Sequence, residues 1–172
     1  MFFCGCTGYK EIDRGYIVTA IGFEKQDGTV GVFIEAISSS DVSDEKSKRI
    51  VLSSNGTDEI KAYENLKNTL VKPLYFEQLG TIIFDKKAIP NTDFLKQITN
   101  INMGIYVVKS DNVKALFESE TPNGVLGYDV ITLIKTQEKQ NGEITKNKFY
   151  KAQKAEFECA VVNSVNGHLI LN

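Results

Sequence analysis

Residues 16–37 read YIVTAIGFEKQDGTVGVFIEAI, and this stretch decides the fold of the chain. Two runs rich in β-branched and aromatic residues, residues 16–23 and 30–37, flank the pair Asp27-Gly28. An Asp-Gly pair between two apolar runs is a strong hairpin signal, because both residues tolerate the positive φ angles of a tight turn. The sequence therefore predicts an N-terminal β-hairpin.

Three helices are predicted further along, each where a hydroxyl residue followed by aspartate can cap a first turn. They begin near Thr57-Asp58, Thr92-Asp93 and Ser110-Asp111. Apolar residues at helical spacing give each helix one core-facing side. These residues are Ile60, Tyr63, Leu66 and Leu70 in the first helix, Phe94, Leu95, Ile98 and Ile101 in the second, and Val113, Leu116 and Phe117 in the third.

Short apolar runs alternate with these helices. Residues 50–54 are typical of a strand, and residues 79–84 and 102–108 are typical of strands covered on both faces. Residues 41–49 are polar, mixed in charge and aperiodic, which indicates a solvated loop. Residues 125–140 predict a fourth helix. The alternation predicts an α/β (α+β) fold, in which a mixed sheet has parallel central strands joined by right-handed crossovers.

The tail predicts a separate unit. Residues 140–143 are typical of a hinge, and residues 157–162 and 168–171 of two strands joined through residues 163–167. The expected organisation is a linker over residues 1–14, an α/β domain over 15–140, and from 141 to 172 a hinge with the hairpin that starts a second domain. A strand that ends so near the last residue indicates a chain cut from a longer protein.

Composition excludes several functions. The 172 residues carry a formal net charge of −2, so the chain lacks the excess of basic residues that attracts a phosphate backbone. Nucleic acid is therefore not an expected partner. Hydrophobic residues make up 42% and charged residues 24%, which is ordinary for a folded domain and unlike a disordered one. No run of 18 apolar residues is present, so a membrane must be reached through an anchor or a partner.

Cys6 is the candidate for such an anchor. It follows the small residue Gly5 and precedes a polar segment, an arrangement typical of a bacterial lipoprotein cleavage site. A diacylglyceryl group plus an N-acyl chain on Cys6 would place two or three hydrocarbon tails in the bilayer, enough for stable anchoring. The lipidated segment is expected within residues 1–14.

Two alternatives to lipidation remain open. The sequence lacks the basic n-region and the apolar stretch of an export signal, so either the true start lies upstream or the motif is an accident of composition. Cys4 and Cys6 could instead form a redox pair or half of a metal site, although the remaining candidate ligands are only Cys159 and His168.

No catalytic constellation is evident. His168, the single histidine, is expected to be an exposed strand residue, so a serine or cysteine nucleophile would lack a base. No helix follows the glycines near residues 22–31, which excludes a dinucleotide fingerprint. Solvation or capping explains the carboxylates Asp41, Asp44, Glu45, Asp58 and Glu59. Tyr63, Tyr75, Tyr106 and Tyr128 could line a ligand cleft, although core edges are the commoner role for tyrosine.

The order of these segments resembles the spore germination receptor C subunits, which are lipoproteins of endospore-forming bacteria. The resemblance starts at Cys6 and the strand over residues 17–24, IVTAIGFE. It continues through the helix at 62–70 to the Leu-Tyr-Phe element and strand of residues 74–84, LYFEQLGTIIF. Thr92-Asp93-Phe94-Leu95 and residues 105–116 complete the series, and residues 157–170 are similar to the hairpin that opens the second domain.

Two positions depart from the family pattern. Val71-Lys72-Pro73 and Glu77-Gln78 replace the basic residue and the Gly-His step that usually flank the Leu-Tyr-Phe element. Residues 99–102, TNIN, replace an expected aspartate and arginine. Contacts that those residues make in relatives are therefore not expected here.

The resemblance implies a non-catalytic, lipid-anchored subunit of a germinant (nutrient) receptor at the outer face of the spore inner membrane. Its expected partners are two integral-membrane subunits of the A and B type, and neither a cofactor nor a metal is expected. A solute-binding lipoprotein that captures a small molecule is the alternative. A hydrolytic enzyme is a third hypothesis and would need a base that the sequence does not offer.

Overall fold

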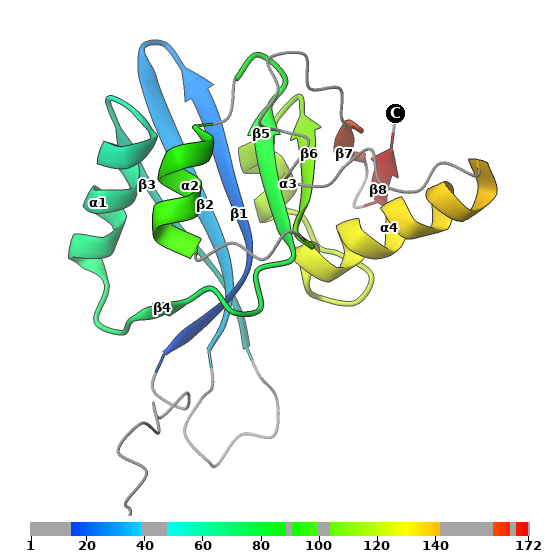
Figure 1. The fold of residues 1–172 in the computed structure, drawn as a ribbon, viewed down its shortest axis with the longest axis horizontal. Helices are drawn as coiled ribbons and strands as arrows, with labels where there is room; N and C mark the ends of the chain where they lie inside the picture. Colours follow the sequence, from blue (N-terminus) through cyan, green and yellow to red (C-terminus); the bar gives the residue numbers. More distant parts are fainter. Residues whose placement is uncertain are drawn as a thin grey trace, which may run out of the picture.

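The computed structural model describes residues 15–38, 48–88, 91–99, 104–141, 160–165 and 168–171. These residues form a mixed β-sheet between two helical layers and a separate two-stranded hairpin (Figure 1). In chain order the elements are β1 (Tyr16–Gln26), β2 (Thr29–Ser38), β3 (Lys48–Gly56), α1 (Glu59–Thr69), β4 (Leu74–Tyr75), β5 (Thr81–Asp85), α2 (Thr92–Thr99), β6 (Tyr106–Ser110), α3 (Val113–Glu118), α4 (Leu126–Asn141), β7 (Val162–Val165) and β8 (His168–Leu171).

The predicted N-terminal hairpin is confirmed. β1 and β2 are antiparallel, and the pairing of Gln26 with Thr29 leaves a two-residue turn. Asp27 and Gly28 occupy the turn with φ angles of 39° and 83°. Positive φ at both positions is the requirement of a type I′ turn, whose twist matches that of the strands.

The sheet has the strand order β3-β2-β1-β5-β6, with β4 paired to the start of β1. β1, β5 and β6 are parallel, whereas β1, β2 and β3 form an antiparallel meander. The predicted mixed sheet with parallel central strands is therefore confirmed. We call the edge where β1, β5 and β6 end the carboxyl-terminal edge, and the opposite edge, where β1 begins, the amino-terminal edge.

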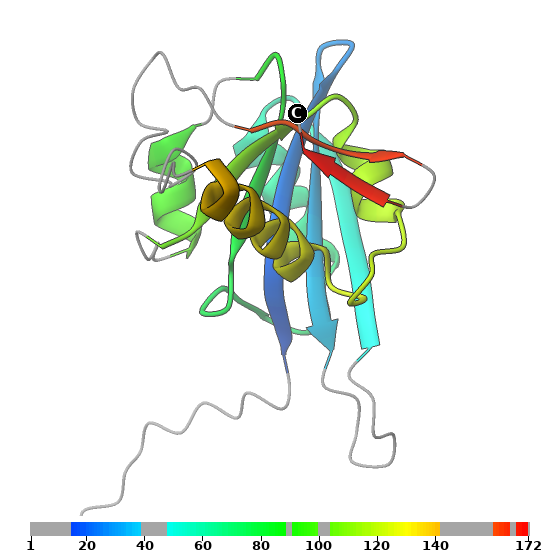
Figure 2. The same ribbon diagram turned by 90° about the vertical axis from the view of Figure 1, so that its right-hand side faces the viewer.

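Two apolar clusters cover the two faces of this sheet. Along β2, Val32 and Ile34 belong to the cluster under α1 and α2, whereas Phe33 belongs to the cluster under α3 and α4. Successive side chains on a strand point to opposite faces, so one apolar run serves both clusters. Figure 2 shows α4 lying across the second face.

The helices start close to the predicted positions, but the capping residues were wrongly assigned. Asx side chains, and not hydroxyls, accept the hydrogen bonds from the first turns, because the short carboxylate or amide reaches a free backbone N–H equally well. Asp58, Asn91 and Asn112 accept from the backbone N–H groups of Lys61, Phe94 and Ala115 at 2.8, 3.1 and 2.8 Å.

Most of the predicted helix faces are buried as expected. Ile60 is the error, since it is 45% exposed and Ala62 takes its place in the core. Ile101 lies outside the described residues. The fourth helix is confirmed, with Val130 and Ile134 buried. Residues that match their predicted core positions in the first three helices are Leu66, Phe94, Leu95, Val113, Leu116 and Phe117.

Three boundaries needed correction. β6 runs over Tyr106–Ser110 and not over the predicted residues 102–108. Lys48 and Arg49 belong to β3 and not to the predicted loop, whose residues 41–47 lie outside the described part of the chain. Asn163, Ser164 and Val165 belong to β7 and not to the predicted turn, since the first strand of the hairpin runs over Val162–Val165. Of the predicted hinge, residues 140 and 141 end α4, and residues 142 and 143 lie outside the description, as do residues 157–159.

The β7–β8 hairpin contacts the main body at β6, α3 and α4. Val162 is fully buried in the second cluster, and the Lys109 backbone N–H donates to the Ala160 carbonyl at 2.9 Å. The Asn163 side-chain oxygen accepts from the Ser110 hydroxyl at 3.1 Å and from the Asp111 backbone N–H at 2.9 Å. One asparagine thus joins the hairpin to the segment that leads into α3.

A pH titration tests the interactions of Asp111, which lies next to this junction. The Lys86 ammonium and the Asn163 amide bond the Asp111 carboxylate and lower its pKa below the ordinary value. A lowered folded pKa contributes stability above the unfolded pKa, near 3.9, and that stability is lost as pH falls through the lower folded pKa. We expect Lys86→Met to raise the pKa of Asp111 in a carboxyl-carbon NMR titration. Lys61→Met is the control and should leave it unchanged.

Candidate functional site

The predicted lipid-attachment residue, Cys6, lies outside the described residues, as do Cys4 and Cys159. His168 is exposed at the start of β8. Within the described ranges, no group of three or more His, Cys, Asp or Glu side chains is placed to hold a metal ion. No described helix is long and apolar enough to cross a bilayer.

A pocket of about 240 Å³ opens at the carboxyl-terminal edge. Its walls come from the β1–β2 hairpin, the start of α1 and the connection after β5. Sites at the carboxyl ends of parallel strands are common in α/β proteins, because loops there converge from several strands. The lining residues are Phe23, Glu24, Lys25, Val30, Glu59, Lys87 and Ala88.

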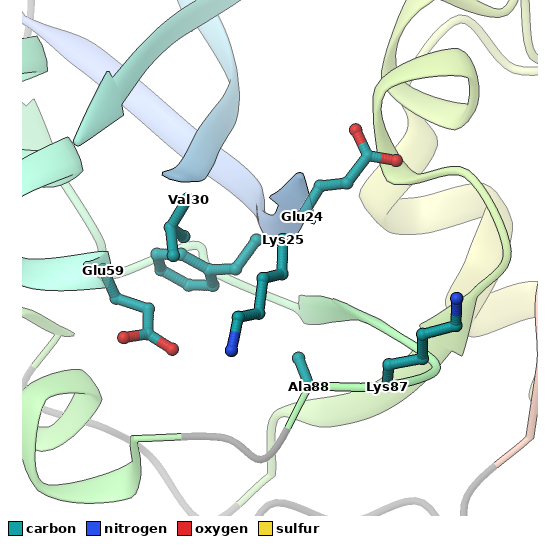
Figure 3. A pocket seen from close by; sticks show the side chains of 7 residues that line it. Glu24, Lys25, Val30, Glu59, Lys87 and Ala88 are labelled. Atoms are coloured by element: carbon teal, nitrogen blue, oxygen red, sulfur yellow. The ribbon is translucent and has the colours of Figure 1, made fainter. Parts of the chain in front are cut away.

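The pocket combines charged side chains with an apolar wall. In Figure 3 the side chains of Lys25 and Glu59 point into the same space, whereas Glu24 points away from it. Among the described residues none forms an ion pair with Lys25, Glu59 or Lys87. Such a set can hold a small polar molecule by charge. Its volume lies below the roughly 300 Å³ at which sites for drug-sized ligands begin.

The four tyrosines do not form one cleft. Tyr63 packs edge-on against Phe94, with ring centroids 5.7 Å apart, and burial raises the pKa of its hydroxyl. Tyr106 is buried in the opposite cluster, and Tyr128 is 41% exposed on α4. Tyr75 lies on β4 at the amino-terminal edge. The tyrosine cleft considered as an alternative is therefore not formed by these residues.

The carboxylates singled out from the sequence behave largely as expected. Asp58 caps α1, and Glu59 lies in the first turn and lines the pocket. Asp41, Asp44 and Glu45 lie outside the described residues. Three carboxylates of the described residues are buried, Glu24, Glu35 and Asp129, and none of them was singled out. Glu24 and Glu35 were missed because each sits in an apolar strand pattern.

Glu35 is the centre of a buried hydrogen-bond network. Its side chain is fully buried, and four donors reach its two carboxylate oxygens. One oxygen accepts from Arg49 Nε at 2.6 Å and from the Leu126 N–H at 2.7 Å. The other accepts from the Thr19 hydroxyl at 2.6 Å and from the Gly127 N–H at 2.9 Å. A carboxylate at the start of α4 satisfies free N–H groups and the positive end of the helix dipole.

Arg49 extends this network to the end of α3. Its two terminal nitrogens donate to the carbonyl oxygens of Phe117 at 2.7 Å and Ser119 at 3.2 Å. A cation at a helix C-terminus satisfies carbonyls that lack an intrahelical partner. Arg49 and Glu35 together therefore fix the end of α3 and the start of α4 to the sheet.

Glu24 does the same for the start of α3. Its carboxylate accepts from the Val113 N–H at 3.1 Å and from the Gln26 side-chain amide at 3.0 Å. Glu24 and Glu35 thus both serve helix N-termini, and neither is aimed into the pocket. Their geometry accounts for them as structural groups.

Comparison with known proteins assigns the chain to a family. A model described as the spore germination protein N-terminal domain matches residues 8–164 of the 172. Searches of curated proteins and of solved structures found no match. The matched region spans every described element from β1 to α4 and the first three residues of β7. This chain therefore belongs to the family of spore germination protein N-terminal domains.

Proposed function

We propose that this chain is the N-terminal part of a non-catalytic, lipid-anchored subunit of a spore germinant receptor. The family match over residues 8–164 is the observation that carries the proposal, because it assigns the chain a role in spore germination. The family is not a known enzyme family. The buried carboxylates Glu24 and Glu35 serve helix ends, which agrees with a non-catalytic body.

Cys6 is the proposed site of lipid attachment. A thioether-linked diacylglyceryl group with an additional acyl chain supplies at least two hydrocarbon tails, whereas a single chain gives only marginal membrane binding. The protein would thereby be held at the outer face of the spore inner membrane. The small residue Gly5 before Cys6 supports this assignment.

The proposed partners are the integral-membrane receptor subunits of the A and B type. Anchoring all subunits in one bilayer raises their effective concentration, so each contact between subunits can be weak and still be occupied. We further propose that β7–β8 opens a second domain. Val162 and Asn163 would then form the junction between the two domains.

Removal of Cys6 tests the anchor. In the complete natural protein, produced in sporulating cells, we expect Cys6→Ala to move the protein from the membrane to the soluble fraction and to abolish co-purification with the membrane subunits. Cys4→Ala is the matched control, since that cysteine lies two residues earlier and should leave both properties unchanged. Mass spectrometry of the retained protein should find the lipid on Cys6.

Three results would contradict the proposal or favour its alternative. Full membrane retention of the Cys6→Ala variant, or an unmodified Cys6 thiol in the native protein, would show that Cys6 does not carry a lipid anchor. Saturable binding of a small molecule by the protein without its membrane subunits, abolished by Lys25→Ala, would instead favour a solute-binding lipoprotein. The pocket at the carboxyl-terminal edge is the place where we would expect such binding.

A further inference from the structure

The amino-terminal edge of the sheet is defined by strand register. Tyr16 at the start of β1 pairs with Ser38 and with Leu74, and Ser38 pairs in turn with Lys48. These residues form one row at the end of the domain opposite the Asp27-Gly28 turn. In Figures 1 and 2 this row lies at the lower end of the sheet, where the described chain begins.

An apolar side chain projects from this edge. Val71, in the loop between α1 and β4, is 94% exposed, more than any other large hydrophobic residue of the described chain. The two residues that follow Val71 hold the loop against the start of β1. The Pro73 carbonyl accepts from the Tyr16 N–H at 2.9 Å, and the Lys72 ammonium lies 6.0 Å from the centre of the Tyr16 ring.

Lysines stand on three segments that end or begin at this edge. Lys72 follows Val71 directly, Lys67 lies in the last turn of α1, and Lys48 stands in the row at the start of β3. Glu77 is the acidic residue on the segment that follows β4. An apolar tip with lysine ammoniums beside it suits the boundary between phosphate headgroups and acyl chains, because long lysine stems keep their charge in water.

We propose that the amino-terminal edge lies against the bilayer, with Val71 in the acyl boundary and Lys72 at the lipid phosphates. The inference rests on the proposed lipid attachment at Cys6. Cys6 precedes Gly15 by nine residues, and nine residues reach at most about 30 Å. The anchor therefore keeps this edge close to the membrane, whereas the pocket at the carboxyl-terminal edge faces away from it.

The contact of Val71 and Lys72 with the bilayer is too weak to bind a free protein, but it can orient a protein that is already anchored. Burial of a valine side chain raises the population of the inserted state by about tenfold. A lysine near anionic headgroups adds roughly a factor of five. A free protein would scarcely bind through two such groups. In an anchored protein the contact is intramolecular and needs no further loss of translational freedom, so these two factors decide which edge faces the bilayer.

Single-tryptophan reporters test the orientation, because the chain contains no tryptophan. The full chain, carrying Cys4→Ser and Cys159→Ser, is coupled through Cys6 to a maleimide lipid in phosphatidylcholine/phosphatidylglycerol vesicles. We expect brominated lipid to quench Val71→Trp at least about threefold more than Thr29→Trp. Thr29 is the matched control, because it is exposed at the opposite edge and carries the same membrane-seeking indole. Addition of Lys72→Glu should lower the quenching of the Val71 reporter.

Equal quenching of the two reporters, or no effect of Lys72→Glu, would overturn the orientation. Protection of the Val71 reporter only in native membranes that contain the other subunits, without quenching by brominated lipid, would also overturn it in favour of a protein partner. Chemical coupling does not depend on natural lipidation. A wrong assignment of the lipid anchor would therefore appear in the Cys6→Ala fractionation and not in the quenching experiment.

Discussion

Replacement of Arg49 by methionine is expected to lower the free energy of unfolding by about 3 kcal/mol. Loss of one partner from a buried ion pair typically costs about 3–5 kcal/mol, because the remaining charge stays buried without compensation. Glu35 would keep three donors, Thr19 and the N–H groups of Leu126 and Gly127, which places the effect at the lower end. Urea denaturation with an unchanged m-value would measure it.

The control for this prediction is a surface pair. Lys61 and Glu64 lie 3.4 Å apart with both side chains more than half exposed, and Lys61→Met should change stability by less than about 0.5 kcal/mol. A double-mutant cycle gives the decisive result. Glu35→Gln should be less costly in the Arg49→Met background than in the wild type, by at least about 1 kcal/mol. Simple additivity would mean that the two side chains do not act as a pair.

Phe117→Ala is expected to destabilise the domain by about 3–5 kcal/mol, the usual range for a buried aromatic residue. Phe117 is fully buried on α3, and its ring centroid lies 5.9 Å from that of Phe33. A methyl group at Gly22 would collide with the Phe117 ring, so the ring lies directly on the sheet backbone. α3 has six residues, too few for stability without such packing.

Ile60→Ala is the matched control for this truncation. Ile60 is exposed on α1, and its loss should change stability by no more than about 0.5 kcal/mol in the same urea titration. Similar effects of the two substitutions would mean that α3 does not pack against Gly22 and Phe33 in solution.

The hairpin and the sheet could be predicted because their signals are local. Asp27-Gly28 sets the turn, and the apolar runs on both sides set the strands. The helix faces followed from spacing in the same way. The predicted capping residues were wrong because an aspartate or asparagine stands within two residues of each predicted hydroxyl. The sequence alone does not show which of two neighbouring side chains accepts the hydrogen bond.

The Glu35 network could not be predicted, because its partners are far apart in the chain. Arg49 is 14 residues from Glu35, and Leu126 and Gly127 are 91 and 92 residues away. Nothing in a run such as FIEAI distinguishes a buried, paired glutamate from an exposed one. The pocket was missed for the same reason, since Lys25, Glu59 and Lys87 meet only when α1 and β5 are folded against the hairpin.

The central position of β1 has a mechanical consequence. β1 is eleven residues long and hydrogen-bonded to β2 on one side and to β4 and β5 on the other. A force that pulls the chain at residues before Gly15 acts along this strand, whereas its hydrogen bonds run across it. Such a load strains all these hydrogen bonds at the same time and does not break them one after another. We therefore expect the domain to resist unfolding when it is pulled from this end.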